Sequence, residues 1–141
     1  MNTAVAIKFR LYCTQTRMGE IVKVTGSGPE LGNWNPAHAL TLHTSKEEFP
    51  IWRAGIFIDY ERQPDPDTLE YKYIIVPYKS SQVDTEYAVG EQFSPYHPKP
   101  IQNQIYWENF EGNRNVSLSQ MGEIQVQDVF NEKKLIKLEV H

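Results

Sequence analysis

Short segments in which apolar and polar residues alternate constrain this chain more than any other feature. The clearest of them is residues 5–12, where Lys8 and Arg10 separate apolar neighbours. Its apolar positions are Val5, Ile7, Phe9 and Leu11. A period of two places one set of side chains on one face of a β-strand.

Segments of similar length and character recur along the chain. They lie at residues 21–24, 52–58, 70–76, 105–107, 116–118, 124–126 and 135–140. Clusters of turn-forming residues separate them at residues 63–67, 109–115 and 131–134. No segment shows a sustained helical period. Many short strands with turns between them predict an all-β fold, an antiparallel β-sandwich of the immunoglobulin-like kind.

Length and charge narrow the class of protein. With 141 residues, the chain suits one domain with its own core, residues 1–141. A net charge of −4 argues against nucleic acid or an anionic membrane as a partner. The single cysteine, Cys13, excludes an internal disulfide and favours a reducing compartment. Since no secretory signal or membrane-spanning run is visible, we expect an intracellular, cytoplasmic protein.

The turn-rich stretch around Trp34 is the most informative local feature. Gly, Pro and Asn surround this tryptophan over residues 25–36, so we expect it on a loop rather than in a regular strand. The ring either folds back over the core or offers a flat apolar platform to a ligand. A phosphate-binding loop is excluded, because no helix follows and Glu30 would repel an anion.

Motifs for catalysis and metal binding are absent from the sequence. We find no nucleophile elbow, no zinc-protease motif and no calcium loop, and the histidines lack ligand spacing. We therefore expect no enzymatic activity, no cofactor and no metal. The residues that remain suit a sugar: Trp34 on its loop, Lys72 on a strand, and Trp107 with Glu108 at a strand end.

Five blocks of sequence carry a resemblance to a known family. They are Gly26-Ser27 with Pro29-Glu30-Leu31-Gly32-Asn33-Trp34, Pro50-Ile51-Trp52, Glu70-Tyr71-Lys72-Tyr73, Trp107-Glu108 and Asn113-Arg114. In this order the chain closely resembles carbohydrate-binding module family 20, the starch-binding domains, over about residues 5–118. The resemblance implies a β-sandwich that binds α-1,4-linked glucan (starch, glycogen, amylopectin or maltooligosaccharides) without cutting it.

The resemblance also implies the roles of particular residues. Trp34 and Trp107 would be the stacking pair of the binding site, Lys72 would hydrogen-bond glucose hydroxyls, and Glu108 and Asn113 would complete the rim. The family's second site uses a tryptophan that matches Trp52. Here that residue lies on the apolar face of its strand, so we interpret Trp52 as a core residue.

Organisation beyond the family-like core is a separate expectation. The chain looks like the N-terminal module of laforin-like glucan phosphatases and glycerophosphodiesterases, which targets an attached or partner enzyme to polysaccharide. The alternatives are a β-sandwich that mediates protein–protein contact and a regulatory sensor of maltodextrins or phosphorylated glucan. Residues 79–104 form an insertion, either a surface excursion or a flap that brings Phe93 or Tyr96 to the site, and residues 119–141 form a C-terminal extension.

Overall fold

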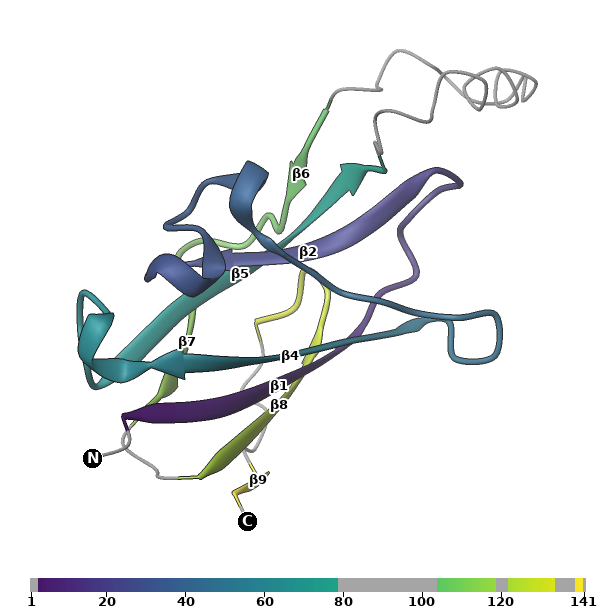
Figure 1. The fold of residues 1–141 in the computed structure, drawn as a ribbon. Helices are drawn as coiled ribbons and strands as arrows, with labels where there is room; N and C mark the ends of the chain where they lie inside the picture. Colours follow the sequence, from purple (N-terminus) through teal and green to yellow (C-terminus); the bar gives the residue numbers. More distant parts are fainter. Residues whose placement is uncertain (1–2, 79–103, 119–121, 134–138, 141) are drawn as a thin grey trace.

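The computed structural model describes residues 3–78, 104–118, 122–133 and 139–140. Two β-sheets lie one above the other, as Figure 1 shows, and short 3-10 turns join some of the strands. The strands are β1 (Ala4–Tyr12), β2 (Glu20–Gly26), β3 (Leu40–Thr41), β4 (Ile51–Asp59), β5 (Thr68–Pro77), β6 (Tyr106–Trp107), β7 (Arg114–Ser117), β8 (Glu123–Val129) and β9 (Glu139–Val140). The 3-10 turns are η1 (Pro29–Leu31), η2 (Pro36–His38) and η3 (Tyr60–Arg62).

The first sheet has the strand order β4-β1-β8-β9. Strand β1 pairs antiparallel with β4 along its full length, from Ala4 opposite Asp59 to Tyr12 opposite Ile51. On its other side β1 runs parallel to β8. Among the strands that the structure describes, the other pairs are antiparallel, and the short-strand pattern did not predict this parallel pair.

The second sheet has the order β3-β2-β5-β6, with β7 also pairing with β5. Strand β5 is its centre and pairs with β2 from Gly26 opposite Tyr71 to Glu20 opposite Pro77. Its other edge is divided, because β7 occupies residues 68–71 and β6 occupies Ile74 and Ile75. The connection between β6 and β7, residues 108–113, therefore passes the stretch of β5 that lies between them.

One apolar core fills the space between the sheets. Its members from the long strands are Val5, Ile7, Phe9, Leu11, Val22, Val24, Trp52, Ile58, Leu69, Tyr71, Tyr73, Ile75, Ile124 and Val126. The ring of Phe9 meets those of Tyr71 and Tyr73 edge to face, at centroid distances of 5.4 and 6.3 Å. Trp52 is buried in this cluster, which confirms its interpretation as a core residue.

The sequence predicted these elements well. Every predicted strand from residues 5–12 to 124–126 is present, and the all-β fold is confirmed. Cys13 is buried as a free thiol, and burial raises its pKa to about 11. Most of the predicted insertion and its flap residues, Phe93 and Tyr96, lie outside the described residues. No helix in the described part of the chain is long and apolar enough to cross a membrane.

Candidate functional site

Strand β5 presents two different faces because its side chains alternate. Tyr71 and Tyr73 point into the core, so Lys72 and Ile74 lie on the opposite, outer face of the second sheet, where Lys72 is partly exposed and Ile74 is covered. The register continues this face across the sheet, with Thr25 of β2 opposite Lys72 and Trp107 of β6 opposite Ile74. Lys72 and Trp107 are thereby brought to the same outer face, where Trp107 is 39% exposed.

The loop that carries Trp34 begins where β2 ends. The Trp34 amide donates to the Gly26 carbonyl at 2.9 Å, and Gly26 pairs with Tyr71 of β5. Asn33 and Trp34 both have positive φ, 52° and 69°. This conformation is rare for a bulky residue and costs on the order of 1–3 kcal/mol, so the surrounding loop must impose it.

Two glycines allow this loop to pack closely against neighbouring residues. A Cβ on Gly26 would collide with the Glu70 carbonyl oxygen, and a Cβ on Gly28 would collide with Gln63 Oε1. The Glu30 carboxylate accepts from Gln63 Nε2 at 2.8 Å and from the Asp59 amide at 3.1 Å. The Gly-rich motif therefore serves close packing, with Glu30 fastening η1 to the end of β4.

Trp34 and Trp107 flank β5 from its two sides. The Trp34 backbone reaches β5 through β2 at the level of residue 71, whereas Trp107 pairs directly with Ile74. Three residues along a strand correspond to roughly 10 Å. Lys72 lies between these two levels. Figure 1 shows the first two 3-10 turns next to β2, and the strand order places β2 and β6 on opposite edges of β5.

The Lys72 ammonium is fixed by the connection between β6 and β7. Its Nζ donates to the Phe110 carbonyl at 3.0 Å and lies 4.9 Å from the centroid of the Phe110 ring. An ammonium has three donors, so donors remain for a ligand after this bond. Sequence reasoning did not single out Phe110, because its role depends on a residue 38 positions earlier.

Glu108 does not form the rim of this site, which corrects the expectation from the sequence. Its side chain is buried and makes an ion pair with Arg114 at 2.6 Å. Adjacent residues of an extended strand point to opposite faces, so Glu108 turns inward where Trp107 turns outward. A sugar on the outer face does not reach this carboxylate.

Asn113 lies at the end of the same connection. Its Nδ2 donates to Glu70 Oε1 at 3.2 Å, and Glu70 shares the outer face of β5 with Lys72. Glu70 is an exposed acceptor that sequence reasoning missed, although its spacing of two from Lys72 was a usable signal. Lys72, Glu70 and Asn113 thus place polar groups together on this face.

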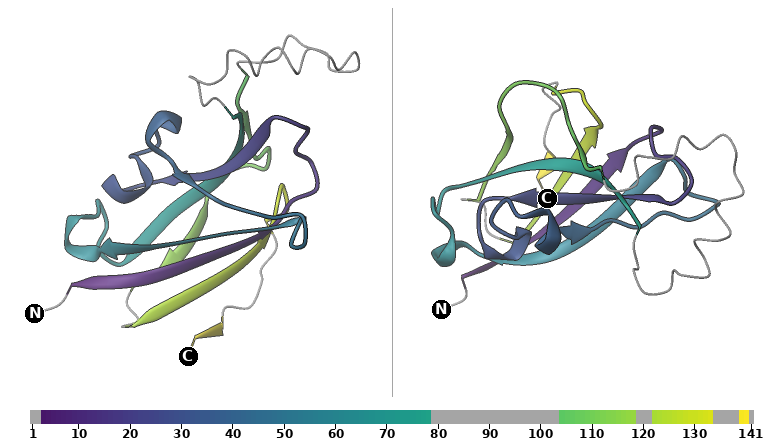
Figure 2. Two further views of the ribbon diagram at one scale, coloured as in Figure 1. Left: turned by 45° about the vertical axis from the view of Figure 1, so that its right-hand side comes forward. Right: turned by 90° about the horizontal axis from the view of Figure 1, so that it is seen from above.

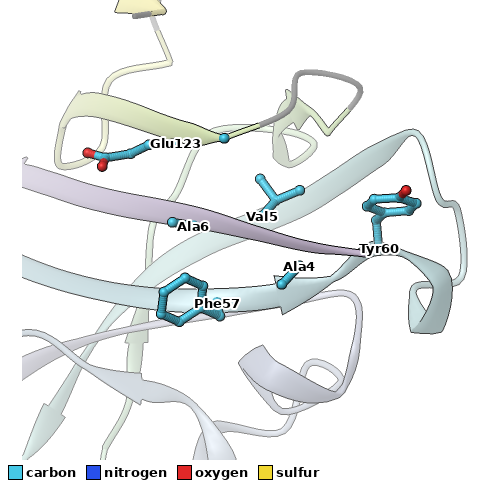
Figure 3. A pocket seen from close by; sticks show the side chains of 7 residues that line it. Ala4, Val5, Ala6, Phe57, Tyr60 and Glu123 are labelled. Carbon is cyan, nitrogen blue, oxygen red and sulfur yellow. The ribbon is translucent and has the colours of Figure 1, made fainter. Parts of the chain in front are cut away.

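A separate hollow lies on the first sheet. It has a volume of about 450 Å³ and is lined by Ala4, Val5, Ala6, Phe57, Tyr60, Gly122 and Glu123. Figure 3 shows β1 running between Phe57 on one side and Glu123 on the other. Phe57 is 70% exposed. Because none of the predicted site residues lies here, this face offers a control for experiments on the candidate site.

A β-sandwich with an exposed tryptophan beside polar side chains on one sheet face is typical of a ligand-binding module. The chain matches the family model for the starch binding domain over residues 4–127. It belongs to the starch binding domain family. The match extends beyond the expected boundary near residue 118 and includes most of β8.

The chain is also similar to segments of longer proteins. The chain is similar to an alpha-amylase of Thermomonospora curvata, 36% identical over 72 residues, which are 51% of this chain and 11% of that protein. A glucoamylase of Neurospora crassa is 35% identical over 82 residues, 53% of this chain and 12% of the relative. The chain therefore spans only a small part of these proteins.

Two solved structures share the fold. A glycoside hydrolase family 15 glucoamylase from Hypocrea jecorina superimposes with a TM-score of 0.63 at 21% identity, covering 92% of this chain and 18% of that one. The family 20 carbohydrate-binding module of a maltotetraose-forming amylase from Pseudomonas saccharophila gives a TM-score of 0.54 at 23% identity, covering 89% and 99%. At this identity the likeness describes the fold alone.

Proposed function

We propose that this chain binds α-1,4-glucan without cutting it, through one site on the outer face of β5. Trp34 and Trp107 stack on glucose rings, while Lys72 and Asn113 hydrogen-bond the hydroxyls. The observation that supports the site best is Lys72, held by the Phe110 carbonyl on the same face as the exposed Trp107. Glu70 is an additional acceptor for sugar hydroxyls on this face.

The chemistry of this face fits a neutral sugar. Indole rings offer flat apolar surfaces to the C–H face of a pyranose, and each such contact contributes about 0.5–1.5 kcal/mol beyond burial. A net hydrogen bond adds a similar amount, about 0.5–1.5 kcal/mol. After ordering costs, these contributions correspond to weak binding, with Kd roughly in the micromolar to millimolar range.

The test uses alanine variants of Trp34, Trp107 and Lys72. Each tryptophan variant is expected to lose at least about tenfold in affinity for β-cyclodextrin by calorimetry, with a parallel loss in starch sedimentation. Lys72→Ala is expected to lose about 1–2 kcal/mol of binding free energy. Phe57→Ala, exposed on the other sheet, is the matched control and is expected to bind normally.

Two results contradict the site assignment. One is full binding of amylopectin by the Trp34→Ala/Trp107→Ala double variant. The other is a loss of affinity in Phe57→Ala, which would indicate that the binding site lies on the first sheet. Thermal melts of every variant separate loss of binding from loss of folding.

We further propose that the domain directs a catalytic domain, attached or separate, to polysaccharide inside the cell. In support, the relatives are enzymes of which the matching region is 11% and 12%. An α-amylase catalytic domain fused to this chain is expected to hydrolyse granular starch faster than the unfused domain, with equal rates on soluble maltooligosaccharides. Equal rates on both substrates would contradict this role.

A further inference from the structure

The connection between β6 and β7 leaves residues 72–73 of β5 without a strand partner on that edge, whereas β2 pairs with them on the other edge. In this gap the Tyr73 amide donates to Glu108 Oε1 at 3.0 Å, and the Tyr73 carbonyl accepts from the Glu108 amide at 3.2 Å. The carboxylate of Glu108 thus takes the place of a strand carbonyl. Figure 2 shows the connection as a green loop standing away from β5.

Glu108 is also bound from two other parts of the chain. Arg114 donates to it twice, from Nε to Oε1 at 3.0 Å and from Nη2 to Oε2 at 2.6 Å. The Asn131 amide donates to Oε2 at 2.9 Å. The side chains of Glu108 and Arg114 are 0% and 5% exposed, so this bidentate pair is shielded from solvent.

The turn after β8 completes the arrangement. Arg114 Nη2 donates to the carbonyls of Val129 and Glu132 at 2.9 and 3.1 Å. Asn131 Oδ1 accepts from the Asn109 amide at 2.9 Å. Asn131 has φ of 68°, a conformation that asparagine adopts more readily than most residues. The β6–β7 connection is therefore tied to β5 and to the end of β8.

Burying these charges is not an efficient way to stabilise a fold. A buried ion pair often contributes no more than apolar residues of the same size, but it fixes geometry through directional bonds. Both residues of the ion pair are next to residues of the candidate site in the sequence. Glu108 follows Trp107, and Arg114 follows Asn113. Phe110, which binds Lys72, lies between them.

We propose that Glu108, Arg114 and Asn131 are positioning residues that hold Trp107 and Asn113 in the geometry that binds glucan. We call these three positioning residues the lock. The inference rests on the proposed function and gives these buried residues a role in affinity without contact to the sugar. A weak ligand gains most from a platform that is ordered before binding, because ordering then costs nothing on association. Asn131, which follows β8 of the first sheet, contributes to that order from the opposite sheet.

The test starts with Asn131, which lies near the surface and is outside the buried ion pair. Asn131→Gly keeps the positive φ and removes the side-chain acceptor of the Asn109 amide, whereas Asn131→Asp keeps an oxygen there. Glu108→Gln breaks the bidentate pair itself. Thr44→Val is the matched control, since it removes a part-buried hydrogen bond to the Ile51 carbonyl at 2.6 Å that involves none of these residues.

Binding of β-cyclodextrin and fluorine NMR of 5-fluorotryptophan protein are then measured. We expect Asn131→Gly to lose roughly threefold to tenfold in affinity, corresponding to one hydrogen bond, with near wild-type affinity in Asn131→Asp and Thr44→Val. The sequence has three tryptophans, so Trp34→Phe and Trp107→Phe assign the resonances. The Trp107 signal is expected to shift or broaden in Asn131→Gly and Glu108→Gln, while that of Trp52 stays unchanged.

The outcomes separate the two proposals. A folded wild-type chain that binds no α-glucan overturns the proposed function and this inference together. If the wild-type chain binds glucan and Asn131→Gly changes neither the affinity nor the Trp107 signal, only the lock is overturned. An equal loss of affinity in Thr44→Val also overturns it, because that result reflects general destabilisation.

Discussion

At the residue scale, Trp107 and Glu108 show how neighbours in one strand take different roles. Trp107 pairs with Ile74 and is partly exposed on the outer face, while Glu108 is buried and bound to Arg114. The same alternation separates Lys72 from Tyr71 and Tyr73 on β5. A residue's place relative to the pleat thus decides whether it faces a ligand or the interior.

The prediction at the residue scale concerns the contribution of Trp52 to stability. Trp52 is 4% exposed, and its ring meets Phe49 edge to face at 6.5 Å. Trp52→Ala leaves a large cavity and is expected to cost about 3–5 kcal/mol in the free energy of unfolding. Urea denaturation measures this cost. A stable Trp52→Ala variant with impaired glucan binding would instead place Trp52 in a second binding site.

Trp52→Phe refines this test. The Trp52 Nε1 is buried without a hydrogen-bond partner among the described residues, so the indole N–H contributes nothing to the fold through hydrogen bonding. We expect Trp52→Phe to cost less than Trp52→Ala, about 1–3 kcal/mol, because most of the ring volume remains. Both variants are expected to bind glucan normally while folded.

At the scale of elements, the loop after β2 shows why glycine is needed in particular places. Gly26 lies against the backbone of β5, and the loop then turns through residues with positive φ to reach Trp34. Gly55 lies in the middle of β4, and a Cβ added there would meet its nearest neighbours at an ordinary contact distance of 3.8 Å. Two glycines in strands of one sandwich are therefore expected to respond to the same substitution in opposite ways.

Gly26→Ala and Gly55→Ala form the matched pair. In Gly26→Ala the new methyl would meet the Glu70 carbonyl and the Tyr71 Cα, so β2 and β5 must separate locally, at a cost of about 1–3 kcal/mol. Gly55→Ala is expected to be neutral or to stabilise by about 0.4–1 kcal/mol, because it restricts the unfolded chain. Thermal melts compare them, and equal effects would contradict the close approach at Gly26.

At the scale of the whole molecule, a polar network connects the two sheets across the core. Asp128 of β8 accepts from the hydroxyls of Tyr71 and Tyr73 at 2.9 and 2.7 Å and pairs with Arg114 at 3.2 Å. Burial lowers the pKa of Arg114, but its bonds to Glu108 and the charge of Asp128 outweigh this and raise it. The guanidinium therefore stays charged, and the network holds the first sheet to the β6–β7 connection.

This network predicts how stability depends on alkaline pH. Burial, and then the charge of Asp128, raise the pKa of Tyr71 and of Tyr73 well above the usual value of 10.0. Below about pH 10 both hydroxyls are protonated in the folded and the unfolded chain, so their full contribution to the free energy of unfolding is present. Above about pH 10 the unfolded chain ionises first, and stability falls as the pH rises toward the folded pKa.

Thermal melts from about pH 8 to about pH 11.5 check this dependence. The Tyr71→Phe/Tyr73→Phe double variant is expected to be less stable at neutral pH and to lose less stability above about pH 10 than the wild type. Tyr12→Phe, an exposed tyrosine of β1, is the control and is expected to follow the wild-type slope. An unchanged slope in the double variant would contradict the assignment to Tyr71 and Tyr73.

The sequence by itself determined the local features of this protein. Alternation in residues 5–12 fixed which face of β1 is buried, the apolar face of β4 made Trp52 a core residue, and turn-formers placed Trp34 on a loop. These features depend on neighbours within a few residues, whose preferences and spacing can be read directly. The resemblance of the five blocks then indicated the family.

Only the tertiary structure decided the features that depend on distant residues. The parallel pairing of β1 with β8, the burial of Glu108 and the contact of Asn109 with Asn131 have no local signal. A glutamate after an exposed tryptophan is by itself as compatible with a sugar as with an arginine. Its role was decided when the fold brought Arg114, Tyr73 and the turn after β8 around its carboxylate, because a buried charge must be satisfied by partners from wherever the chain supplies them.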